Sequence, residues 1–581
     1  MQSSSLDNIP AGGQEQSAQA QSPPRAANVA RTTVRGVVKN AATGEPLPRA
    51  LVRIEGDAAA GMLTDGDGRF EMQGVPIGPQ AFQVVKPGFG DQAAAGMMAG
   101  PVVNGATNSE HNVHVAADMP ELVFNMSPTN SIRGQIELST GDPAQNIGVM
   151  LLRRSVQDGR AVWQAATNVR TNSEGVYRFS GLADGTYMIY TEPSMDSELP
   201  VGLVEADNQA VVMRAGFPSM FYPEARDMAG AGKIQLAGGQ QAQANILLAQ
   251  EPFYMVRAKV TLPGAGPTKA GDRSQTNVTI VVQDAQGHQL SYGGQYDQAS
   301  RSVQAFLPDG TYSLLLTVVT PHMPARFGTG RALPAMAKSE GPLVGQVDFS
   351  VNGHSVTNLT IPLTAQQNNM VQLAMVRTAT PSGVESQGGP LVVMLSQTGG
   401  WITDGMVSSY AEGYATGPLE ATFMGPGTYW VHTSIPQRGL CESSFTAGGA
   451  SLAREPLAIS LSGATAPLTL TLRDDCAKLK VSLPPSVEEP TVGEEPYYTV
   501  YVVPEFDSTS DITPITLRAS SGGELTIDGL TPGAYRVFCF TTPVEFEYRN
   551  PEALAASSTP GQVITLTPGM TGNLIVEVPG H

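Results

Sequence analysis

The stretch FMGPGTYWV, residues 423–431, is one of five copies of a phrase that decides the fold. Each copy has an apolar residue, a tight turn with glycine, and a strand rich in aromatic or branched residues. The others are GVPIGPQAFQV (74–84), GLADGTYMI (181–189), FLPDGTYSL (306–314) and GLTPGAYRV (529–537). Counted between Gly78, Gly185, Gly310, Gly427 and Gly533, the copies are 106 to 125 residues apart. This spacing suits one small domain per copy and exceeds the period of a solenoid.

A second pattern, two strands around a polar turn, ends each unit from the second onward. In LAISLSGATAPLTLTL (457–472), leucines 468, 470 and 472 alternate with polar residues, so one strand face is predicted to be buried. Short strands with frequent turn signals predict antiparallel β-sandwiches and very little helix. The predicted units, called modules 1 to 5, are residues 31–126, 127–252, 253–365, 366–475 and 476–581. Residues 1–30, rich in Gln, Ser, Ala and Pro, are predicted to be a disordered leader.

Composition narrows the classes of partner. The chain has 34 Lys and Arg against 52 Asp and Glu, a net charge of -18, which disfavours nucleic acid and anionic membranes. No apolar run approaches the roughly 20 residues of a membrane helix, so no membrane-spanning segment is expected. The first residues lack the apolar core of a signal peptide, so an export signal is not written in this sequence.

Residues 34–89 contain a recognisable set of positions: Gly36, Val38, 43–46, Ala50, Thr64, Asp65, Asp67, Gly68, Phe70, 74–76 and Gly78. In these positions the segment resembles a carboxypeptidase regulatory-like domain, a transthyretin-like sandwich grouped with carbohydrate-binding folds. Arg49 stands where glycine is usual, and Gln80 where an aromatic is usual, with Phe82 expected to fill that space. Module 2 matches more loosely. The resemblance implies an all-β tandem array of Ig-like or transthyretin-like sandwiches, similar to secreted or surface proteins of bacteria, with a structural or binding role.

Catalytic motifs are missing from the sequence. It has no zinc-protease HExxH and no nucleophile GxSxG, and its seven histidines are scattered. His111 and His114 form the one close pair, in a polar stretch that suits a solvated loop better than a metal site. The turn TDGDG (64–68) lacks the remaining ligands of a calcium loop. We therefore expect no enzyme, metal or cofactor.

The three cysteines carry information about cellular location. Cys441 follows the fourth repeat and Cys476 lies 35 positions later, in the strand that leaves module 4. In an exported protein they could form a disulfide that contributes on the order of 3 kcal/mol; the alternative is two buried thiols. The export argument favours the disulfide. Cys539 is expected to be a small core residue.

Large aromatic side chains are the candidate ligand platforms. The repeat tyrosines Tyr187, Tyr312, Tyr429 and Tyr535 are expected in the cores, so their successors Met188, Ser313, Trp430 and Arg536 point outward. Trp430 could stack against a sugar or pack against another module, and packing is favoured because closely strung modules must touch. Trp401 and Trp163 carry the same ambiguity.

These observations predict an exported, elongated, non-enzymatic array that acts as a surface scaffold, adhesion or ligand-binding stalk. Its expected location is extracellular, on the cell surface or periplasmic. Its expected partner is a polysaccharide or another surface protein. The alternative is a carbohydrate-binding accessory protein that works with a separate hydrolase.

Overall fold

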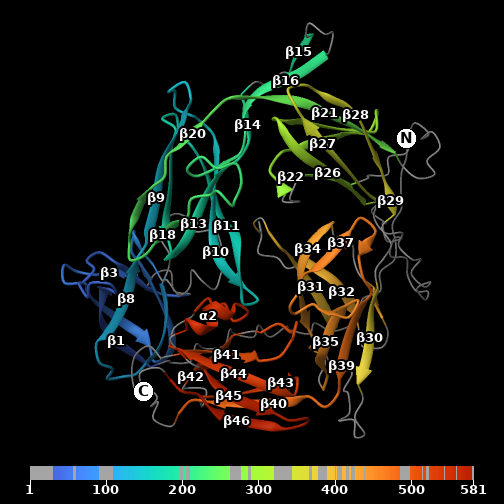
Figure 1. Ribbon diagram of the computed structural model, residues 1–581. Helices are drawn as coiled ribbons and strands as arrows, with labels where there is room; N and C mark the ends of the chain where they lie inside the picture. The colour runs from blue at the N-terminus through green and yellow to red at the C-terminus, as the bar shows by residue number, and fades with distance from the viewer. Residues whose placement is uncertain are drawn as a thin grey trace, which may run out of the picture.

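The computed structural model in Figure 1 consists almost wholly of β-strands, which confirms the predicted all-β class. Its only α-helix among the described residues is α2 (Pro551–Ala555). The described residues are 30–55, 61–90, 109–196, 200–204, 210–261, 277–284, 289–319, 343–365, 370–376, 389–399, 401, 408–413, 418–420, 425–436, 439–484, 497–512, 514–518, 523–541, 544–557, 559 and 561–578. The predicted leader, apart from Ala30, lies outside them.

Module 1 has two four-stranded sheets, in the orders β4-β1-β8-β6 and β3-β2-β5-β7. The strands are β1 (Arg31–Asn40), β2 (Leu51–Ile54), β3 (Gly61–Leu63), β4 (Arg69–Pro76), β5 (Gly78–Val85), β6 (Phe89–Gly90), β7 (Ser109–Val115) and β8 (Leu122–Pro128). Arg49 adopts a φ of 56°, a conformation that glycine tolerates better than other residues. Phe82 is fully buried against Phe124, 5.7 Å between ring centroids, and fills the space predicted for it.

Module 2 packs a sheet ordered β11-β10-β13-β17, with β18 beside β13, against a sheet of β12, β9, β19 and β20. Its strands are β9 (Asn130–Leu138), β10 (Gly148–Gln157), β11 (Arg160–Arg170), β12 (Val176–Leu182), β13 (Gly185–Thr191), β17 (Met220–Phe221), β18 (Ile234–Leu236), β19 (Gln241–Gln243) and β20 (Ile246–Leu248). Three further strands leave this sandwich: β14 (Ser194–Met195), β15 (Val201–Val204) and β16 (Ala210–Phe217). β16 pairs with β21 (Glu251–Thr261), so modules 2 and 3 share a sheet.

Module 3 completes that shared sheet and adds the sheet β23-β22-β26-β27-β29. Its further strands are β22 (Asn277–Asp284), β23 (Gln289–Leu290), β24 (Gly294–Asp297), β25 (Ser302–Leu307), β26 (Gly310–Val319), β27 (Leu343–Val351), β28 (Val356–Pro362) and β29 (Thr364–Ala365).

Module 4 has sheets β33-β30-β39-β35-β36 and β32-β31-β34-β37-β38. Its strands are β30 (Met370–Val376), β31 (Leu391–Gln397), β32 (Ser408–Gly413), β33 (Leu419–Glu420), β34 (Gly427–Ser434), β35 (Cys441–Ala447), β36 (Ala450–Ser451), β37 (Leu457–Ser460), β38 (Gly463–Ala464) and β39 (Leu468–Arg473).

Module 5 has sheets β43-β40-β46 and β42-β41-β44-β45. The strands are β40 (Ala477–Ser482), β41 (Tyr497–Pro504), β42 (Ile515–Arg518), β43 (Glu524–Leu530), β44 (Gly533–Phe540), β45 (Gln562–Leu566) and β46 (Thr571–Ile575).

In every module the first strand also pairs in parallel with a late one: β1 with β8, β9 with β19 and β20, β21 with β28, β30 with β39, and β40 with β46. The sandwiches are therefore antiparallel apart from this closing pair.

The repeat tyrosines are buried in four separate cores, as the alternation predicts. Each hydroxyl donates to the carbonyl four residues earlier: Tyr187 to Ala183 (2.8 Å), Tyr312 to Pro308 (3.1 Å), Tyr429 to Gly425 (2.6 Å) and Tyr535 to Thr531 (2.7 Å). This folds the ring back over the turn. A Cβ on Gly310 would lie 2.7 Å from the Tyr312 hydroxyl oxygen, so in this copy glycine makes room for the ring.

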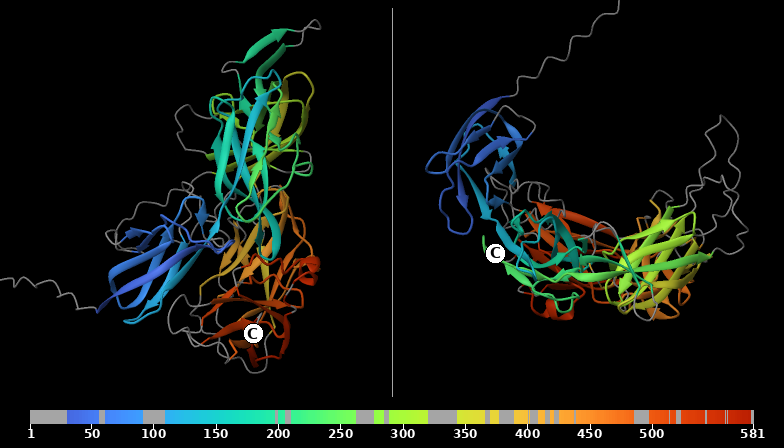
Figure 2. Two further views of the ribbon diagram at one scale, coloured as in Figure 1. Left: turned by 90° about the vertical axis from the view of Figure 1, so that its left-hand side faces the viewer. Right: turned by 90° about the horizontal axis from the view of Figure 1, so that it is seen from above.

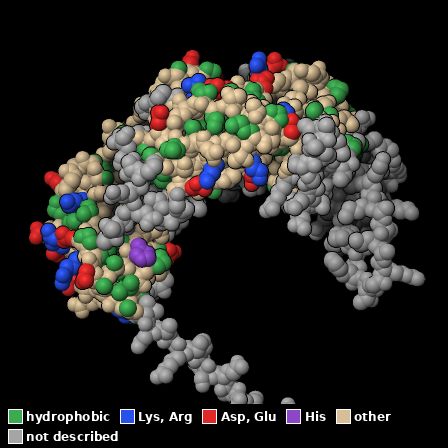
Figure 3. Space-filling view, turned by 90° about the horizontal axis from the view of Figure 1, so that it is seen from below, with side chains coloured by type: hydrophobic (Ala, Val, Ile, Leu, Met, Phe, Trp, Pro, Cys, Tyr) green, Lys and Arg blue, Asp and Glu red, His purple; other side chains and the backbone are tan. Residues whose placement is uncertain are grey.

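Modules 2 to 5 do not form the elongated string that the sequence predicts. Figure 1 shows them arranged in a circuit in which module 5 returns to lie beside module 2. Ion pairs and hydrogen bonds join residues almost 400 positions apart, as between Arg153 and Glu545. Module 1 projects from this ring, as the view from above shows (Figure 2). From below the molecule is arched, and its charged side chains are scattered in small mixed groups (Figure 3).

Candidate functional site at the junction of modules 2, 4 and 5

The β10–β11 hairpin of module 2 closes the ring. Its turn is the dipeptide Asp158-Gly159, with φ of 45° and 66°, the left-handed conformation that a two-residue type I′ turn requires. A Cβ on Gly159 would lie 2.6 Å from the Tyr548 ring, so the turn fits closely against module 5. Along the stem, Arg154 pairs with Glu547 (2.6 Å).

The Asp158 carboxylate at the tip is the centre of a buried charged cluster, which we call the hub. Its Oδ2 lies 2.9 Å from Arg549 Nε, 3.0 Å from Arg160 Nη1 and 2.9 Å from His432 Nδ1. The Tyr548 hydroxyl donates to Oδ1 at 2.8 Å. The Asp158 side chain is only 3 % exposed. One carboxylate therefore joins three modules.

The hub also perturbs the acidity of its members. Burial alone would raise the pKa of Asp158, but the hydrogen bond with His432 and the charge of Arg549 hold that pKa below its ordinary value. Burial and the nearby charge of Arg549 lower the pKa of the Arg160 guanidinium to about 10. Asp158 is therefore ionised and both guanidinium groups are charged at neutral pH.

His432 links Asp158 to a hydroxyl on its other side. His432 Nε2 lies 2.8 Å from Ser396 Oγ, so Ser396, His432 and Asp158 follow the order of a nucleophile, a base and an orienting acid. Ser396 and His432 are 9 % and 3 % exposed, however, and two guanidinium groups already neutralise Asp158. A nucleophile must meet its substrate, so we assign this chain of contacts a structural role.

The three tryptophans lie at the same junction. The Arg160 guanidinium covers the Trp430 ring at 3.8 Å from the centroid. Trp401 packs on Tyr190 and Phe221 of module 2, with centroids 4.8 and 5.9 Å apart. Trp163 packs against the same cluster. The three tryptophan rings, which the sequence identifies as candidate ligand platforms, are therefore engaged in contacts within the protein.

Met188 also belongs to this contact, because it points away from the core of module 2, as predicted, yet is only 2 % exposed. The residues that sequence reasoning missed are Asp158, Arg160, His432, Tyr548 and Arg549. The Asp-Gly dipeptide was the available signal, and it predicts the hairpin but not what the hairpin touches.

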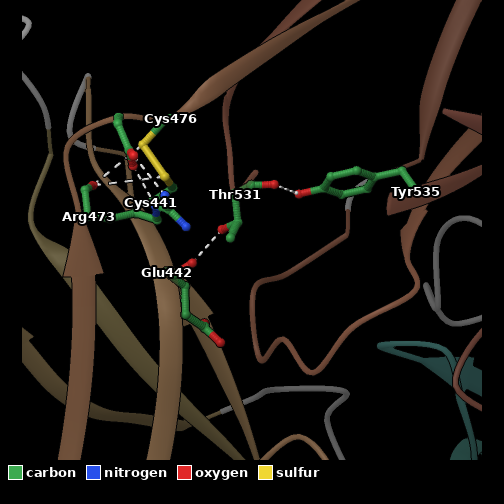
Figure 4. Close-up of a disulfide and its surroundings, with 7 residues drawn as sticks. Cys441, Glu442, Arg473, Cys476, Thr531 and Tyr535 are labelled. Carbon is green, nitrogen blue, oxygen red and sulfur yellow. Dashed lines mark hydrogen bonds and ion pairs between the residues drawn. A yellow bond between two sulfur atoms is a disulfide. The ribbon is translucent and has the colours of Figure 1, made fainter. Parts of the chain in front are cut away.

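A second junction joins modules 4 and 5 (Figure 4). Cys441 on β35 and Cys476, just before β40, form a disulfide with Cα atoms 5.9 Å apart. The neighbouring Glu442 carboxylate is buried and accepts hydrogen bonds from Thr433 Oγ1 (2.6 Å) and from the Thr509 backbone nitrogen (2.7 Å) and hydroxyl (2.7 Å). The Glu442 carbonyl accepts from the Thr531 hydroxyl. A cleft of about 500 Å³ opens beside this junction.

The remaining candidates have structural explanations. The solvated loop expected around His111 and His114 is wrong: both lie on β7, and His111 is buried and stacks on Phe124 with ring centroids 4.6 Å apart. In the TDGDG turn, Asp65 Oδ1 accepts from the backbone nitrogens of Asp67 and Arg69 at 3.0 and 2.8 Å. Cys539 is a buried free thiol whose pKa is raised to about 11 by burial. The described part of the chain has no cluster of three potential metal ligands and no helix long and apolar enough to span a membrane.

Comparison with known proteins gives one family match. Residues 33–116 match the carboxypeptidase regulatory-like domain. This covers module 1 and agrees with the resemblance found in its residues. The match says nothing directly about modules 2 to 5. No curated protein matches the chain.

Comparison with solved structures gives only remote likenesses. The Bacillus anthracis TIE protein is 13 % identical, with 70 % of this chain and 64 % of that one covered and a TM-score of 0.14. A streptococcal ancillary pilin is 10 % identical, with 58 % and 99 % covered and a TM-score of 0.18. GBS52, the minor pilin of Streptococcus agalactiae, is 12 % identical, with 41 % and 100 % covered and a TM-score of 0.19. At such scores the likenesses carry no functional argument.

Proposed function

We propose that the protein is an exported, non-enzymatic scaffold of the cell surface or periplasm. In this proposal modules 2 to 5 form a closed ring that holds module 1 and the outer sheet faces in fixed positions for a partner. The hub around Asp158 carries the proposal, because it fixes three modules with one buried carboxylate. A ring clamped in this way suits display better than a flexible tether.

The disulfide supports export. Structural disulfides form and persist in oxidising compartments and are rare in the cytosol. The bond between Cys441 and Cys476 stands at the junction of modules 4 and 5, where it limits their relative movement. Secretion would expose this junction to shear and proteases, against which such a bond protects.

The first experiment locates the native protein and reads its cysteines. We expect antibody against module 1 to label intact or outer-membrane-permeabilised cells. Mass spectrometry after alkylation should find Cys441 and Cys476 oxidised and Cys539 reduced. Cytosolic protein with three alkylated cysteines would contradict export. A Cys539→Ser protein, whose disulfide is intact, controls for alkylation of the buried thiol.

The second experiment tests the absence of catalysis at Ser396. A fluorophosphonate probe reports serine nucleophiles that are activated by a histidine. We expect no labelling of the folded protein. Labelling that disappears in Ser396→Ala but persists in Ser313→Ala, a half-buried serine on β26, would overturn the non-enzymatic role.

A carbohydrate-binding accessory role is the second candidate. The tryptophans give it little support, because Trp430 and Trp401 of module 4 contact module 2, and Trp163 packs against the same apolar cluster as Trp401. One polar groove on the outer face of module 2 favours it.

A further inference from the structure

The groove lies on the sheet of module 2 that faces away from the ring interior. In Figure 1, β9 and β20 form the outer side of module 2, opposite β10 and β11, which carry the hub. The groove encloses about 550 Å³ over β12, β9 and β19. This volume falls in the range of small-ligand sites. The side chains that line it are polar, apart from Val176 and Ala242.

Two arginines stand directly opposite each other in the groove. Arg133 on β9 pairs in register with Arg178 on β12, and both are exposed. Side chains directly opposite in an antiparallel pair have Cβ atoms about 5 Å apart, and like charges there destabilise the sheet. Neither guanidinium has an acidic partner among the described residues. Acidic residues outnumber basic ones in this chain, so a site with two adjacent arginines and no acidic partner is unusual for it.

At the floor of the groove, the strand that pairs with β9 is interrupted. Between β19 and β20 the strand ladder breaks, and Asn245 Oδ1 accepts from the backbone nitrogen of Gln135 at 3.0 Å in place of a backbone carbonyl. Gln243 Nε2 also points to Asn245 Oδ1, at 3.4 Å. This leaves the Asn245 amide nitrogen as a donor beside the arginines. Gln241 adds a neutral amide at the same edge.

We infer that this groove binds a carboxylate-bearing polysaccharide. A guanidinium presents paired N–H donors that match a carboxylate, so a uronate group between Arg133 and Arg178 would relieve their repulsion. The neighbouring amides can exchange hydrogen bonds with sugar hydroxyls. The net charge of -18 opposes dense polyanions, which favours a glycan with separated carboxylates over nucleic acid or a heavily sulfated chain. This inference adds a ligand to the proposed scaffold and does not depend on closure of the ring.

The test measures binding of oligogalacturonate to the full chain by calorimetry at low salt. Arg133→Gln and Arg178→Gln should each weaken binding at least tenfold, since each removes a charge-assisted contact. Arg35→Gln, an exposed arginine of module 1, should leave binding unchanged. Thermal unfolding separates the site from a structural role. Removing one of two repelling charges should leave the melting temperature equal or raise it, whereas a structural arginine would lower it.

Competing ligands identify the chemistry. Neutral galactan oligosaccharides should not bind. Equal binding of heparin or of poly-glutamate would overturn the inference, because the groove would then be a general anion surface. Absence of oligogalacturonate binding at millimolar concentration would also overturn it. Either failure leaves the scaffold proposal intact, since location and cysteine oxidation are measured independently.

Discussion

Replacement of Asp158 by asparagine should open the ring while leaving the sandwiches folded. Asparagine has nearly the same shape but no charge, and its amide nitrogen would face donors of His432 or the arginines. Arg549 and Arg160, whose side chains are 12 % and 16 % exposed, would lose their anion. Breaking a buried ion pair by removing one partner costs about 3–5 kcal/mol. At roughly 1.4 kcal/mol per tenfold, the closed state becomes at least a hundredfold less favoured.

The natural fluorophores report on this junction alone, because the only three tryptophans of the chain, Trp163, Trp401 and Trp430, all lie in it. In urea, the tryptophan emission of the variant should shift to the red at a lower midpoint than in the wild type. Circular dichroism of the strands should change later, at a midpoint close to that of the wild type. Small-angle scattering should show a larger radius of gyration between the two transitions.

Asp507→Asn is the matched control, since Asp507 pairs with Arg454 on the surface, where side chains are 38 % and 76 % exposed. Exposed pairs contribute about 0–1 kcal/mol, so this variant should follow the wild type. If Asp158→Asn shifts the tryptophan midpoint no more than Asp507→Asn does, the hub does not close the ring and the reasoning fails.

Three further predictions concern other features. Loss of the disulfide in Cys441→Ser should lower the stability of the junction of modules 4 and 5 by about 3–4 kcal/mol, measured by urea unfolding with and without reductant, and reductant should have no effect on the variant. Burial raises the pKa of Tyr429 to about 12, so the folded protein holds this phenol proton more tightly than the unfolded chain does. The free energy of unfolding should therefore be unchanged below about pH 10 and fall as the pH rises toward 12. Circular dichroism should be lost together with the rise of tyrosinate absorbance. Gly159→Ala should destabilise the hub by about 1–3 kcal/mol in the tryptophan assay, because the backbone there is left-handed and the added Cβ would meet the Tyr548 ring. Gly44→Ala is the control: its φ is similar but its Cβ would lie in open space, so it should lose only the free energy of placing alanine in a left-handed conformation.

The fold of each module is readable from the sequence because its determinants are local. The alternation around Tyr187 and Tyr429 fixes which face is buried, and the turn residues fix where strands end. For Cys441 and Cys476 the expected compartment favoured a disulfide over two buried thiols, and the structure contains that disulfide. The extra parallel strand pair in each module was not predicted, because strand order is set by packing between distant segments and leaves no periodicity in the sequence.

The junction could not be predicted, because it depends on the path of the whole chain. Asp158 and Tyr548 are 390 positions apart. The alternation shows correctly that Met188 and Trp430 point away from their own cores. It carries no information about which module covers them. The predicted elongated array is therefore wrong. The sequence pattern describes each module alone, whereas the angles between modules are set by the sheet that modules 2 and 3 share and by the hub.

The chemistry of the hub indicates what it adds to an interface that already has apolar contacts. Tyr190, Phe221 and Trp401 bury apolar area, which favours contact but tolerates many orientations. A buried carboxylate that needs several donors at once is satisfied in one arrangement only. Replacing a buried charged cluster as a whole with apolar residues is often neutral for stability, whereas removing one member is costly. The charges around Asp158 therefore act mainly as a register device: they penalise every orientation of modules 2, 4 and 5 other than the closed one.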